Sequence, residues 1–485
     1  MLHPLSFYRF YRKNRFAEAL ASLCKETSVR FSDELWACYR LGLYHTVAST
    51  PLFKSKNWRG GFAWAVSLAA CGRHEESKAQ VHSWLNTGVC DEQKANLADC
   101  LVPFQPELAH EILQGIVAPA TLRSAICLRV GQNELARKIL ADHLTSHSDT
   151  VNPEAWLYYS NASEALSSID KLENLNRFLD AYQVPRLRMI DELCPPSPMN
   201  VQSAEDYPVV SGPLVTVLMT AYNSAARITS AIRSVITQSY RNIELIVIDD
   251  TSSDMTSDIV KTIMEDDKRV KFMSLPRNVG PYVAKNMGLL FAKGEFITCH
   301  DSDDWSHPLK IERQVTPLLK NRKLICTTSD WVRMQDDGTY YARPVHPLQR
   351  FNPSSPLFRR KEVLETIGAW DCVRTGADSE FIARLKLVFG RKAVLKIRQP
   401  LAFGSHRQGS LMTSPETGYS STGISPLRLA YWESWTYWHI DQLRAGKKPR
   451  MPSLMEERAF SAPSGITVTP LHIARNLEEV EREYF

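Results

Sequence analysis

Residues 297–305, with the sequence ITCHDSDDW, join an apolar strand-like run directly to three aspartates within four positions. Carboxylates this close together repel one another at low dielectric unless a cation lies between them. Oxygen ligands at a strand end suit a hard divalent ion such as Mg²⁺ or Mn²⁺ that is shared with substrate phosphates. The alternative is a solvated acidic turn that caps the following helix through Asp304 or Ser306. The stretch therefore predicts a strand end that carries either a metal site or a capping turn.

Short apolar runs alternate with amphipathic helical segments on the N-terminal side of this stretch. Strands are expected at 214–221, 243–248, 270–274 and 295–299, with helices between them. This alternation predicts right-handed βαβ crossovers and a mainly parallel, Rossmann-like sheet whose ligand site lies at the carboxyl ends of the strands. Polar residues follow each expected strand at that edge: Thr220, Ala221, Tyr222 and Asn223; Asp249 and Asp250; Arg277 and Asn278; and Asp301, Ser302, Asp303 and Asp304.

Several common motifs are missing from the sequence. No G-x-G-x-x-G follows the first expected strand, and no G-x-x-x-x-G-K-[ST] occurs. No serine lies on a nucleophile elbow. The sequence therefore disfavours a dinucleotide-binding enzyme, a P-loop enzyme and a serine hydrolase.

Five consecutive motifs resemble those of the family 2 glycosyltransferases, which have a GT-A fold. Thr251 replaces the usual glycine of the second motif, a change expected to lose little. Lys285 replaces the usual arginine of the third, which keeps a cation but loses bidentate geometry. The resemblance implies inverting transfer of a sugar from a nucleoside-diphosphate sugar to a hydroxyl. The motifs are 220–223 (TAYN), 247–254 (VIDDTSSD), 278–280 (NVG) with 284–288 (AKNMG), 294–297 (GEFI) and 301–304 (DSDD).

The resemblance also implies roles on the donor side. Asp303 would bind Mn²⁺ or Mg²⁺, while Asp301 would hold the ribose, or the metal through water. Asp250, with Asp249, would accept hydrogen bonds from the base, which suits uracil and hence a UDP-sugar. Tyr222 would stack on the base, with a core aromatic as the alternative. The full set expected to bind the nucleotide sugar is Thr220, Ala221, Tyr222, Asn223, Asp249, Asp250, Arg277, Asn278, Lys285, Asp301 and Ser302.

An inverting displacement needs a general base opposite the leaving group. Residues 376–381 (GADSEF) resemble the family's acidic acceptor-side motif, and Asp378 is the predicted base, with a helix N-cap as the alternative role. Glu380 is the reserve base, and Asp371 is a further expected acceptor contact. Trp370 is the predicted platform for the acceptor sugar, with core packing as the alternative.

Residues 406–410 (HRQGS) resemble the basic motif that closes over the diphosphate. His406 is accordingly predicted to be a second metal ligand or a phosphate donor. A structural histidine is the alternative for this residue.

The first part of the chain has a helical pattern as far as about residue 193. Segments 10–20, 69–79 and 128–138 are similar to one another, and each places Asn or Gly before a charged turn and a new helix. Their spacing predicts stacked helical hairpins of about 30 residues, similar to tetratricopeptide repeats. Such a region either presents a surface to a protein partner or caps the neighbouring domain.

Prolines between residues 195 and 213 mark a change of pattern. The predicted fold is therefore multidomain, with an all-α repeat at 1–194, a linker at 195–213, an α/β GT-A domain at 214–424 and a helical extension at 425–485. Segment 429–440 of the extension is apolar nearly all round and is predicted to pack against the chain's own domains. A subunit or membrane interface is the alternative for that segment.

The composition limits the remaining choices. With 485 residues, two or three domains are expected, and a net charge of +5 does not argue for nucleic acid. Ten scattered cysteines suit a reducing compartment. No signal-peptide core or long apolar run occurs, so a cytoplasmic protein is predicted. The basic, aromatic N-terminus leaves peripheral contact with the inner face of the plasma membrane open.

The predicted function is a metal-dependent, inverting glycosyltransferase for cell-surface polysaccharide, with a glycan or lipid-linked acceptor. A sugar-nucleotide pyrophosphorylase is one alternative, but it requires a glycine-rich loop with an arginine after the first strand. A non-catalytic binding scaffold is the other alternative. The presence of Asp301, Asp303 and Asp378 together disfavours a scaffold.

Overall fold

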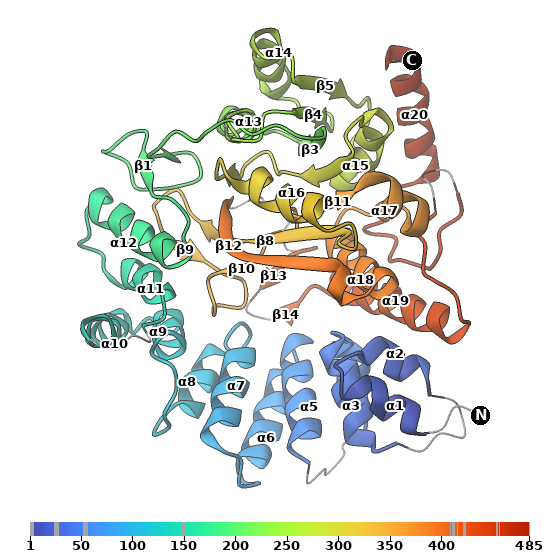
Figure 1. The fold of residues 1–485 in the computed structure, drawn as a ribbon. Coiled ribbons are helices and arrows are strands. Elements are labelled where there is room, and N and C mark those ends of the chain that lie inside the picture. The colour runs from blue at the N-terminus through green and yellow to red at the C-terminus, as the bar shows by residue number, and fades with distance from the viewer. Residues whose placement is uncertain are drawn as a thin grey trace.

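The protein is described by a computed structural model that covers residues 4–23, 29–51, 57–146, 151–407, 409, 413–414, 416–420, 423–452, 454 and 456–484. Helices near the N-terminus form an arc, and an α/β region lies against this arc (Figure 1). Further helices follow at the C-terminal end. The predicted order of an all-helical part, an α/β part and a helical tail is confirmed.

The N-terminal arc consists of helices joined by short turns. Its helices are α1 (Pro4–Tyr11), α2 (Phe16–Ala21), α3 (Phe31–Arg40), α4 (Tyr44–Ala48), α5 (Trp58–Ala70), α6 (His74–Leu85), α7 (Asp91–Leu101), α8 (Pro106–Ile112), α9 (Ala120–Arg129), α10 (Asn133–Thr145), α11 (Glu154–Ala162) and α12 (Ser168–Ala181). Left-handed backbone recurs in the turns at Asn14, Gly42, Gly72 and Gly131. Glycine adopts this conformation without steric cost, and asparagine tolerates it. The turns recur at intervals of about 30 or 60 residues, in agreement with the predicted hairpin spacing.

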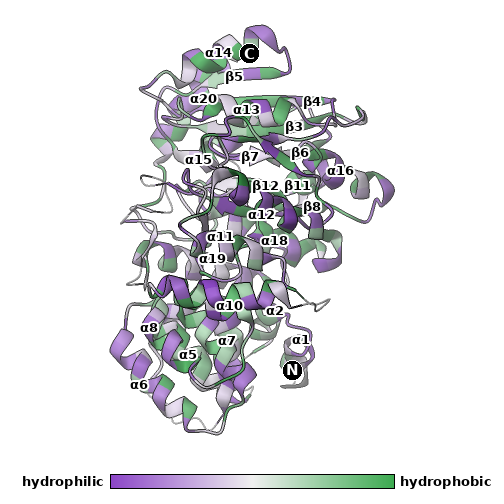
Figure 2. Cartoon of the chain, turned by 90° about the vertical axis from the view of Figure 1, so that its left-hand side faces the viewer, coloured by the Kyte–Doolittle hydropathy of each residue, from purple (hydrophilic) through white to green (hydrophobic). Residues whose placement is uncertain are grey.

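Successive helices of the arc differ in how much of their surface is buried. In α5 nearly every residue is buried, whereas in α6 the buried residues are Ser77, Val81 and Trp84. Figure 2 shows the same contrast, with a largely hydrophobic α5 and a largely hydrophilic α6. Helices such as α5 therefore form the core of the arc, and helices such as α6 form its outer surface.

The helical pattern ends earlier than the sequence predicts. After α12, residues 187–189 form strand β1 (Leu187–Met189), which pairs antiparallel with β2 (Val201–Ser203). The expectation of helix as far as residue 193 is wrong because Pro185 stops the helix and Asn176 binds the backbone of Leu187 through both side-chain atoms, at 2.8 and 3.0 Å. This hairpin lies across the start of the predicted linker.

A single twisted sheet forms the centre of the α/β region. Its strands are β3 (Val215–Ala221), β4 (Ile243–Asp249), β5 (Val270–Ser274), β6 (Phe296–Cys299), β7 (Trp305–Ser306), β8 (Cys326–Met334), β9 (Tyr340–Tyr341), β10 (Arg350–Phe351), β11 (Leu357–Arg359) and β12 (Val394–Ser405). The main order is β5-β4-β3-β6-β11-β8-β12-β7, with β9 and β10 paired to β8. The first four strands in this order are parallel, as predicted, while β11 and β7 run antiparallel to their neighbours.

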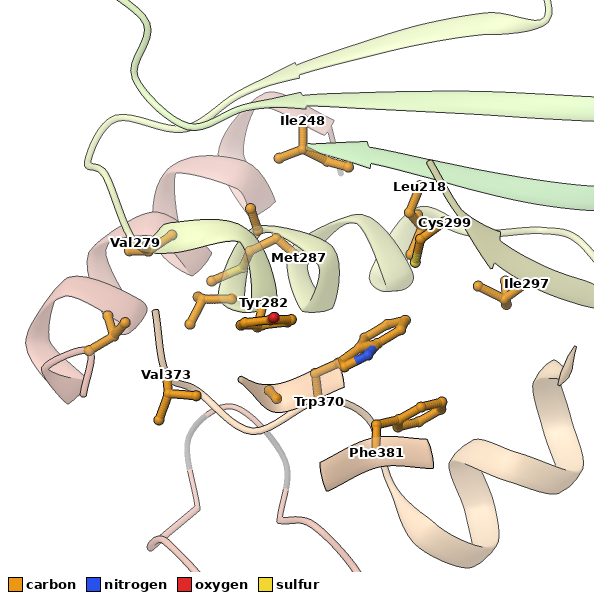
Figure 3. Packing of buried hydrophobic residues seen from close by; sticks show 14 of the residues in the cluster. Leu218, Ile248, Val279, Tyr282, Met287, Ile297, Cys299, Trp370, Val373 and Phe381 are labelled. Carbon is orange, nitrogen blue, oxygen red and sulfur yellow. The ribbon is translucent and has the colours of Figure 1, made fainter. Parts of the chain in front are cut away.

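Helices cover both faces of this sheet. They are α13 (Ile228–Ile236), α14 (Thr256–Asp266), α15 (Gly280–Phe291), α16 (Lys310–Lys320), α17 (Arg360–Ile367) and α18 (Ala377–Phe389). Val217 and Leu218 are neighbours on β3 but belong to different buried clusters, because alternate residues of a strand face opposite sides. Leu218 packs with Met287 and Phe381 in the cluster shown in Figure 3. Burial on both faces explains why the parallel strands are almost continuously apolar.

The C-terminal part joins the arc to the α/β region. It contains β13 (Tyr419–Ser420), β14 (Gly423–Ile424), α19 (Pro426–Arg444) and α20 (Pro470–Tyr484). On α19, the Trp432 indole donates to the Leu41 carbonyl at 2.7 Å, and Glu433 accepts hydrogen bonds from Thr46 at 3.0 Å. The predicted burial of this aromatic helix against the chain's own domains is therefore confirmed. Within the described ranges, no helix has both the length and the apolar character needed to cross a membrane.

Candidate active site

Lys285 is buried at the centre of a polar cluster whose carboxylates are partly exposed. Its Nζ atom is 3.6 Å from Asp378 Oδ1 and 4.0 Å from Asp301 Oδ1, and its side chain is 2% exposed. Tyr282, three residues earlier on α15 and hence on the same face, donates to Asp378 Oδ2 at 2.8 Å. The end of β6 and the first turn of α18 therefore meet at one place. We call Lys285, Asp301, Asp303 and Asp378 the acidic cluster.

The charges in the acidic cluster perturb one another. Burial raises the pKa of Asp378, the Lys285 ammonium opposes this rise, and Asp301 adds to it. Burial lowers the pKa of Lys285, but the negative charges of Asp378 and Asp301 outweigh it and raise the pKa overall. A carboxylate whose pKa is raised holds a proton more strongly, which suits a general base.

Asp303 extends the acidic cluster toward the end of β12. Its Oδ2 accepts a hydrogen bond from Arg407 Nε at 3.1 Å, and its side chain is 21% exposed. Burial and the charge of Asp301 raise the pKa of Asp303, whereas Arg407 lowers it. Arg407 belongs to the predicted basic motif, of which Gln408 and Ser410 lie outside the described residues.

Asp304 has a structural role rather than the predicted capping role. It is buried and accepts a hydrogen bond from the Ser405 backbone at 3.0 Å, which ties the acidic turn to β12. Helix α16 begins at Lys310, four or more residues beyond both predicted capping residues. The capping-turn interpretation is therefore wrong, because Asp304 and Ser306 are engaged with other parts of the fold.

The oxygen atoms near the acidic cluster fit a cation that is shared with a substrate. The described part of the chain contains no group of three or more acidic, histidine or cysteine side chains that could hold a metal by itself. Asp301 and Asp303 keep 37% and 21% of their side chains exposed, so their oxygens are accessible. Mg²⁺ and Mn²⁺ are commonly bound by one or two carboxylates together with substrate phosphates. The donor set therefore suits such an ion only in combination with a phosphate ligand.

His406 is partly buried and packs against an aromatic ring. Its ring stacks on Tyr341 with the centroids 3.5 Å apart, and its buried Nδ1 atom has no hydrogen-bond partner among the described residues. Burial and the charge of Arg333 lower the pKa of His406 to about 4, so the imidazole is neutral near pH 7. A neutral imidazole is the form that binds metals. The predicted ligand role for His406 stays a prediction.

The loops after β3 and β4 lie side by side. Asn223 donates its backbone N–H to Ser252 Oγ at 2.9 Å, and its side chain accepts from the Ser253 backbone at 2.8 Å. Tyr222, between these loops and solvent, is 53% exposed. The core-aromatic alternative for Tyr222 is therefore wrong, and its ring is accessible to a planar base.

Asp249 and Asp250 both hold loops in position. Asp250 accepts the backbone N–H groups of Val279 and Gly280 at 2.7 Å each, at the start of α15. Burial raises the pKa of Asp250 to about 6. Asp249 is buried and accepts from Ser257 Oγ at 2.8 Å as well as from Ser252. The carboxylates thus fix the edge of the sheet, and their predicted contacts with a base stay predictions.

Thr251 adopts a backbone conformation that favours glycine. Its φ is 70°, in the left-handed region, and its hydroxyl donates to the Leu275 carbonyl at 3.1 Å. A branched side chain in this region costs about 1–2 kcal/mol. The expectation that replacing the usual glycine loses little is therefore corrected.

The remaining donor-side predictions divide between exposed and buried positions. Arg277 is exposed, while Asn278 donates to the Asp250 carbonyl at 2.9 Å and accepts from Arg374 at 2.5 Å. Ser302 is buried, and its hydroxyl lies 2.8 Å from that of Ser224. The structure therefore brings Asn278 and Ser302 into the framework of the site and leaves Arg277 at its surface. Thr220 and Ala221 end β3 beside these residues.

Sequence analysis missed three residues near the acidic cluster. Tyr282 precedes Lys285 by three positions in a helix, and this spacing is the signal that could have identified it. Lys310 is buried close to Asp304, Cys299 and Asp301, and burial lowers its pKa to about 8. Arg374, which binds Asn278, has no signal in the local sequence.

Three predicted acceptor residues lie in the core instead. Trp370 is 4% exposed and stacks on Phe381 with the centroids 4.9 Å apart, as Figure 3 shows. Asp371 accepts from Tyr431 at 3.0 Å and from Arg458 at 2.8 Å. Glu380 is fully buried. The acceptor roles predicted for Trp370, Asp371 and Glu380 are wrong because packing or ion pairs occupy their surfaces.

Part of this chain is similar in sequence to known glycosyltransferases. The family model described as "Glycosyl transferase family 2" matches residues 216–377. An uncharacterized glycosyltransferase of Haemophilus influenzae is 44% identical over 126 residues, which is 26% of this chain and 50% of the relative. The Escherichia coli UDP-Glc:alpha-D-GlcNAc-diphosphoundecaprenol beta-1,3-glucosyltransferase WfgD is 40% identical over 108 residues, or 22% of this chain and 42% of the relative. The chain spans half or less of the length of these two curated relatives.

A search of solved structures adds one further likeness. Residues 1–349 of S. aureus TarS in complex with UDP-GlcNAc match with a TM-score of 0.36 and 18% identity, over 56% of this chain and 72% of that chain. The parallel strands, the motifs at their carboxyl ends and the family match all fall in the same part of the sequence. Residues 216–377, about a third of this chain, are therefore similar to glycosyl transferase family 2.

Proposed function

We propose that this chain is an inverting glycosyltransferase that moves a sugar from a UDP-sugar to a hydroxyl of a glycan or lipid-linked acceptor. The observation that carries the proposal is the meeting of Asp301, Lys285 and Asp378 at the carboxyl edge of the parallel strands. That edge is where α/β sheets bind ligands. The name of the E. coli relative, which specifies UDP-Glc and a diphosphoundecaprenol-linked sugar, supports this class of donor and acceptor.

Asp378 is the general base of the proposed reaction. Its carboxylate takes the proton of the acceptor hydroxyl while that oxygen forms a bond to the anomeric carbon of the donor. The bond from the anomeric carbon to the diphosphate oxygen breaks at the same time, and the nucleoside diphosphate leaves with the electron pair. Tyr282 and Lys285 hold the two oxygens of Asp378 and orient the base.

The donor diphosphate is expected to bind beside Asp301 and Asp303. A divalent cation held by Asp303, with Asp301 and His406 as further candidate ligands, would neutralise charge on the leaving group. Arg407 keeps Asp303 in position through its hydrogen bond at 3.1 Å. Tyr222 offers an exposed ring for the base, and Asn223 fixes the loop that carries it.

The domain assignment is part of the same proposal. Residues 214–424 form the catalytic domain, and 1–194 form a helical-repeat domain that supports it and offers a surface to partners. Residues 195–213 connect the two domains, and 425–485 extend the catalytic domain with helices. We place the reaction in the synthesis of cell-surface polysaccharide at the cytoplasmic side.

An assay of nucleotide release separates this function from its alternatives. The purified chain is incubated with UDP-glucose, UDP-GlcNAc or UDP-galactose and Mn²⁺, with GDP-mannose as a donor control. We expect UDP release from at least one UDP-sugar, and loss of release in Asp378→Asn. Formation of UTP when pyrophosphate is added would indicate a pyrophosphorylase instead. UDP binding without turnover under any acceptor condition would indicate a scaffold.

A further inference from the structure

A cavity of about 300 Å³ lies between the helical arc and the α/β region. Tyr39 on α3 and Tyr44 on α4 line it from the arc, and Tyr341 on β9 and Tyr419 on β13 line it from the later part of the chain. None of these residues takes part in the proposed reaction. The cavity therefore depends on the packing of the arc against the α/β region.

Cationic side chains predominate in this cavity. Arg129, Arg343 and Arg350 line it, and the single carboxylate among the lining residues, Asp99, is paired with His346 at 3.2 Å. Among the described residues, neither Arg343 nor Arg350 has a carboxylate partner within ion-pair distance. Burial lowers the pKa of Arg350 and the charge of Arg343 lowers it further, while the nearby carboxylates of Asp99 and Glu154 oppose this fall without cancelling it. Two guanidinium groups in this situation are stabilised by a bound anion.

Aromatic rings stand beside these cations. The Arg343 guanidinium lies 3.7 Å from the centroid of the Tyr419 ring, and Arg428 lies 4.6 Å from the same ring. The rings of Tyr39 and Tyr44 are 5.9 Å apart. The flat C–H faces of sugar rings pack on aromatic faces, and arginines bind phosphate and carboxylate groups. The combination suits an anionic saccharide better than a purely apolar ligand.

The cavity is also connected to the acidic cluster. Tyr341, which lines the cavity, stacks on His406, and the next residue, Arg407, donates to Asp303 at 3.1 Å. Two consecutive residues of the chain thus join the wall of the cavity to the proposed cation site. The cavity wall is therefore in contact with the chain segment that holds Asp303.

We propose that this cavity binds an anionic saccharide of the acceptor, with its phosphate or carboxylate on Arg343 and Arg350 and its sugar ring against the other tyrosine side chains of the cavity wall. The inference rests on the proposed function, because it assigns the cavity to the acceptor of that reaction. It also gives the helical arc a direct role, since Tyr39 and Tyr44 line the site from the arc.

Isothermal titration calorimetry of the full chain with α-D-glucose 1-phosphate, without nucleotide, tests the proposal. We expect saturable binding with a Kd of about 1 mM or tighter. Arg343→Gln and Arg350→Gln should each weaken binding about tenfold, because each removes a charge-assisted hydrogen bond. The matched control is Arg137→Gln, which removes an exposed arginine paired with Glu134 on α10 and should leave the affinity unchanged. Thermal melting of each variant verifies that it is folded.

Further titrations make the outcome decisive. Glucuronate in place of glucose 1-phosphate distinguishes a carboxylate from a phosphate, and tighter binding of either anionic sugar than of glucose supports the proposal. Glucose that binds as tightly as glucose 1-phosphate overturns it, as does an affinity that both arginine variants retain. Inorganic phosphate that binds as tightly as glucose 1-phosphate overturns the assignment to a saccharide.

Titration with UDP distinguishes a failure of the cavity proposal from a failure of the proposed transferase function. If UDP binds and neither anionic sugar does, the cavity proposal fails while the donor site stands. If an anionic sugar binds through Arg343 and UDP does not bind, the cavity is a saccharide site, but the proposed transferase function fails and the assignment to its acceptor fails with it.

Discussion

The buried Lys285 forms an ion pair with the partly exposed Asp378, with Nζ 3.6 Å from Oδ1, although α15 and α18 are far apart in the chain. The same amine lies 4.0 Å from Asp301, so one cation faces two carboxylates. Tyr282 holds the other oxygen of Asp378. This arrangement fixes a carboxylate at the edge of the sheet, where a sugar acceptor could reach it.

Replacing the proposed base should affect catalysis far more than binding. We expect Asp378→Asn to lower the kcat for transfer by about 10²–10⁴-fold, because an amide cannot accept the proton of the acceptor. The affinity for UDP should change less than about threefold, because the variant removes only one charge that acts on UDP from a distance. Steady-state kinetics and calorimetry with UDP measure the two quantities.

A first-turn aspartate elsewhere provides the control for this variant. Asp258 is exposed in the first turn of α14, away from the acidic cluster, and Asp258→Asn should keep the wild-type rate. Retention of more than a tenth of the rate by Asp378→Asn would show that another group takes the proton.

Lys285 should be replaceable by another cation but not by an apolar residue. Lys285→Met leaves Asp301 and Asp378 without their shared partner and should destabilise the fold by about 3–5 kcal/mol. Lys285→Arg keeps the charge in a tight site and should cost about 1–3 kcal/mol through overpacking. Urea denaturation followed by tryptophan fluorescence measures both values. An arginine variant no more stable than the methionine variant would rule out an electrostatic role for this residue.

The chain pattern was sufficient to predict the four parallel strands and their common direction. Val217 and Leu218 are adjacent and both buried, so continuous apolar runs correctly indicated strands covered on both sides. The polar residues after those strands do meet at one edge. Topology rules alone connect these features, because parallel strands present their carboxyl ends together.

The acceptor side could not be predicted equally well. Asp378 and Glu380 are two positions apart in a helix, so they point in different directions and only one of them can face the acidic cluster. Asp378 faces Lys285, whereas Glu380 faces Arg384 and His439 in the core. Which of the two faces the acidic cluster depends on how α18 packs on the sheet, and the local sequence does not contain that information.

Glu380 should make the stability of the fold depend on acid pH. Burial raises its pKa, but Arg384 at 2.7 Å and His439 outweigh burial and lower the pKa to about 2. A folded-state pKa below the unfolded value stabilises the fold above about pH 4.5, and this contribution is lost as the pH falls toward 2. We expect Glu380→Gln to destabilise the protein by about 3 kcal/mol at pH 7, and the difference from wild type to shrink between about pH 5 and 2.

Denaturant titrations at several pH values provide the measurement. Glu362→Gln, which changes an exposed glutamate on α17, should match the wild type at each pH. A Glu380→Gln deficit that stays constant from pH 7 to pH 3 would contradict the low pKa of this carboxyl.

Replacing Thr251 by glycine should have opposing effects on the stability of the fold. Its φ of 70° is strained for a branched residue, and glycine relieves that strain. Glycine also increases the freedom of the unfolded chain and removes the hydrogen bond to Leu275. The strain relief of about 1–2 kcal/mol is nearly offset by the added freedom and the lost hydrogen bond, each about 1 kcal/mol, so we expect Thr251→Gly to change the stability by less than about 1 kcal/mol, measured by thermal melting. A loss of more than 1 kcal/mol would mean that the hydroxyl contact outweighs the strain.

The most direct test of the central claim is UDP release from a UDP-sugar by wild type and Asp303→Ala, with Mn²⁺ and with EDTA. The account predicts that wild type with Mn²⁺ releases UDP, and that EDTA and Asp303→Ala each reduce release by at least about 100-fold, because the leaving diphosphate then carries uncompensated charge. Equal release by wild type and Asp303→Ala, unaffected by EDTA, would contradict the account.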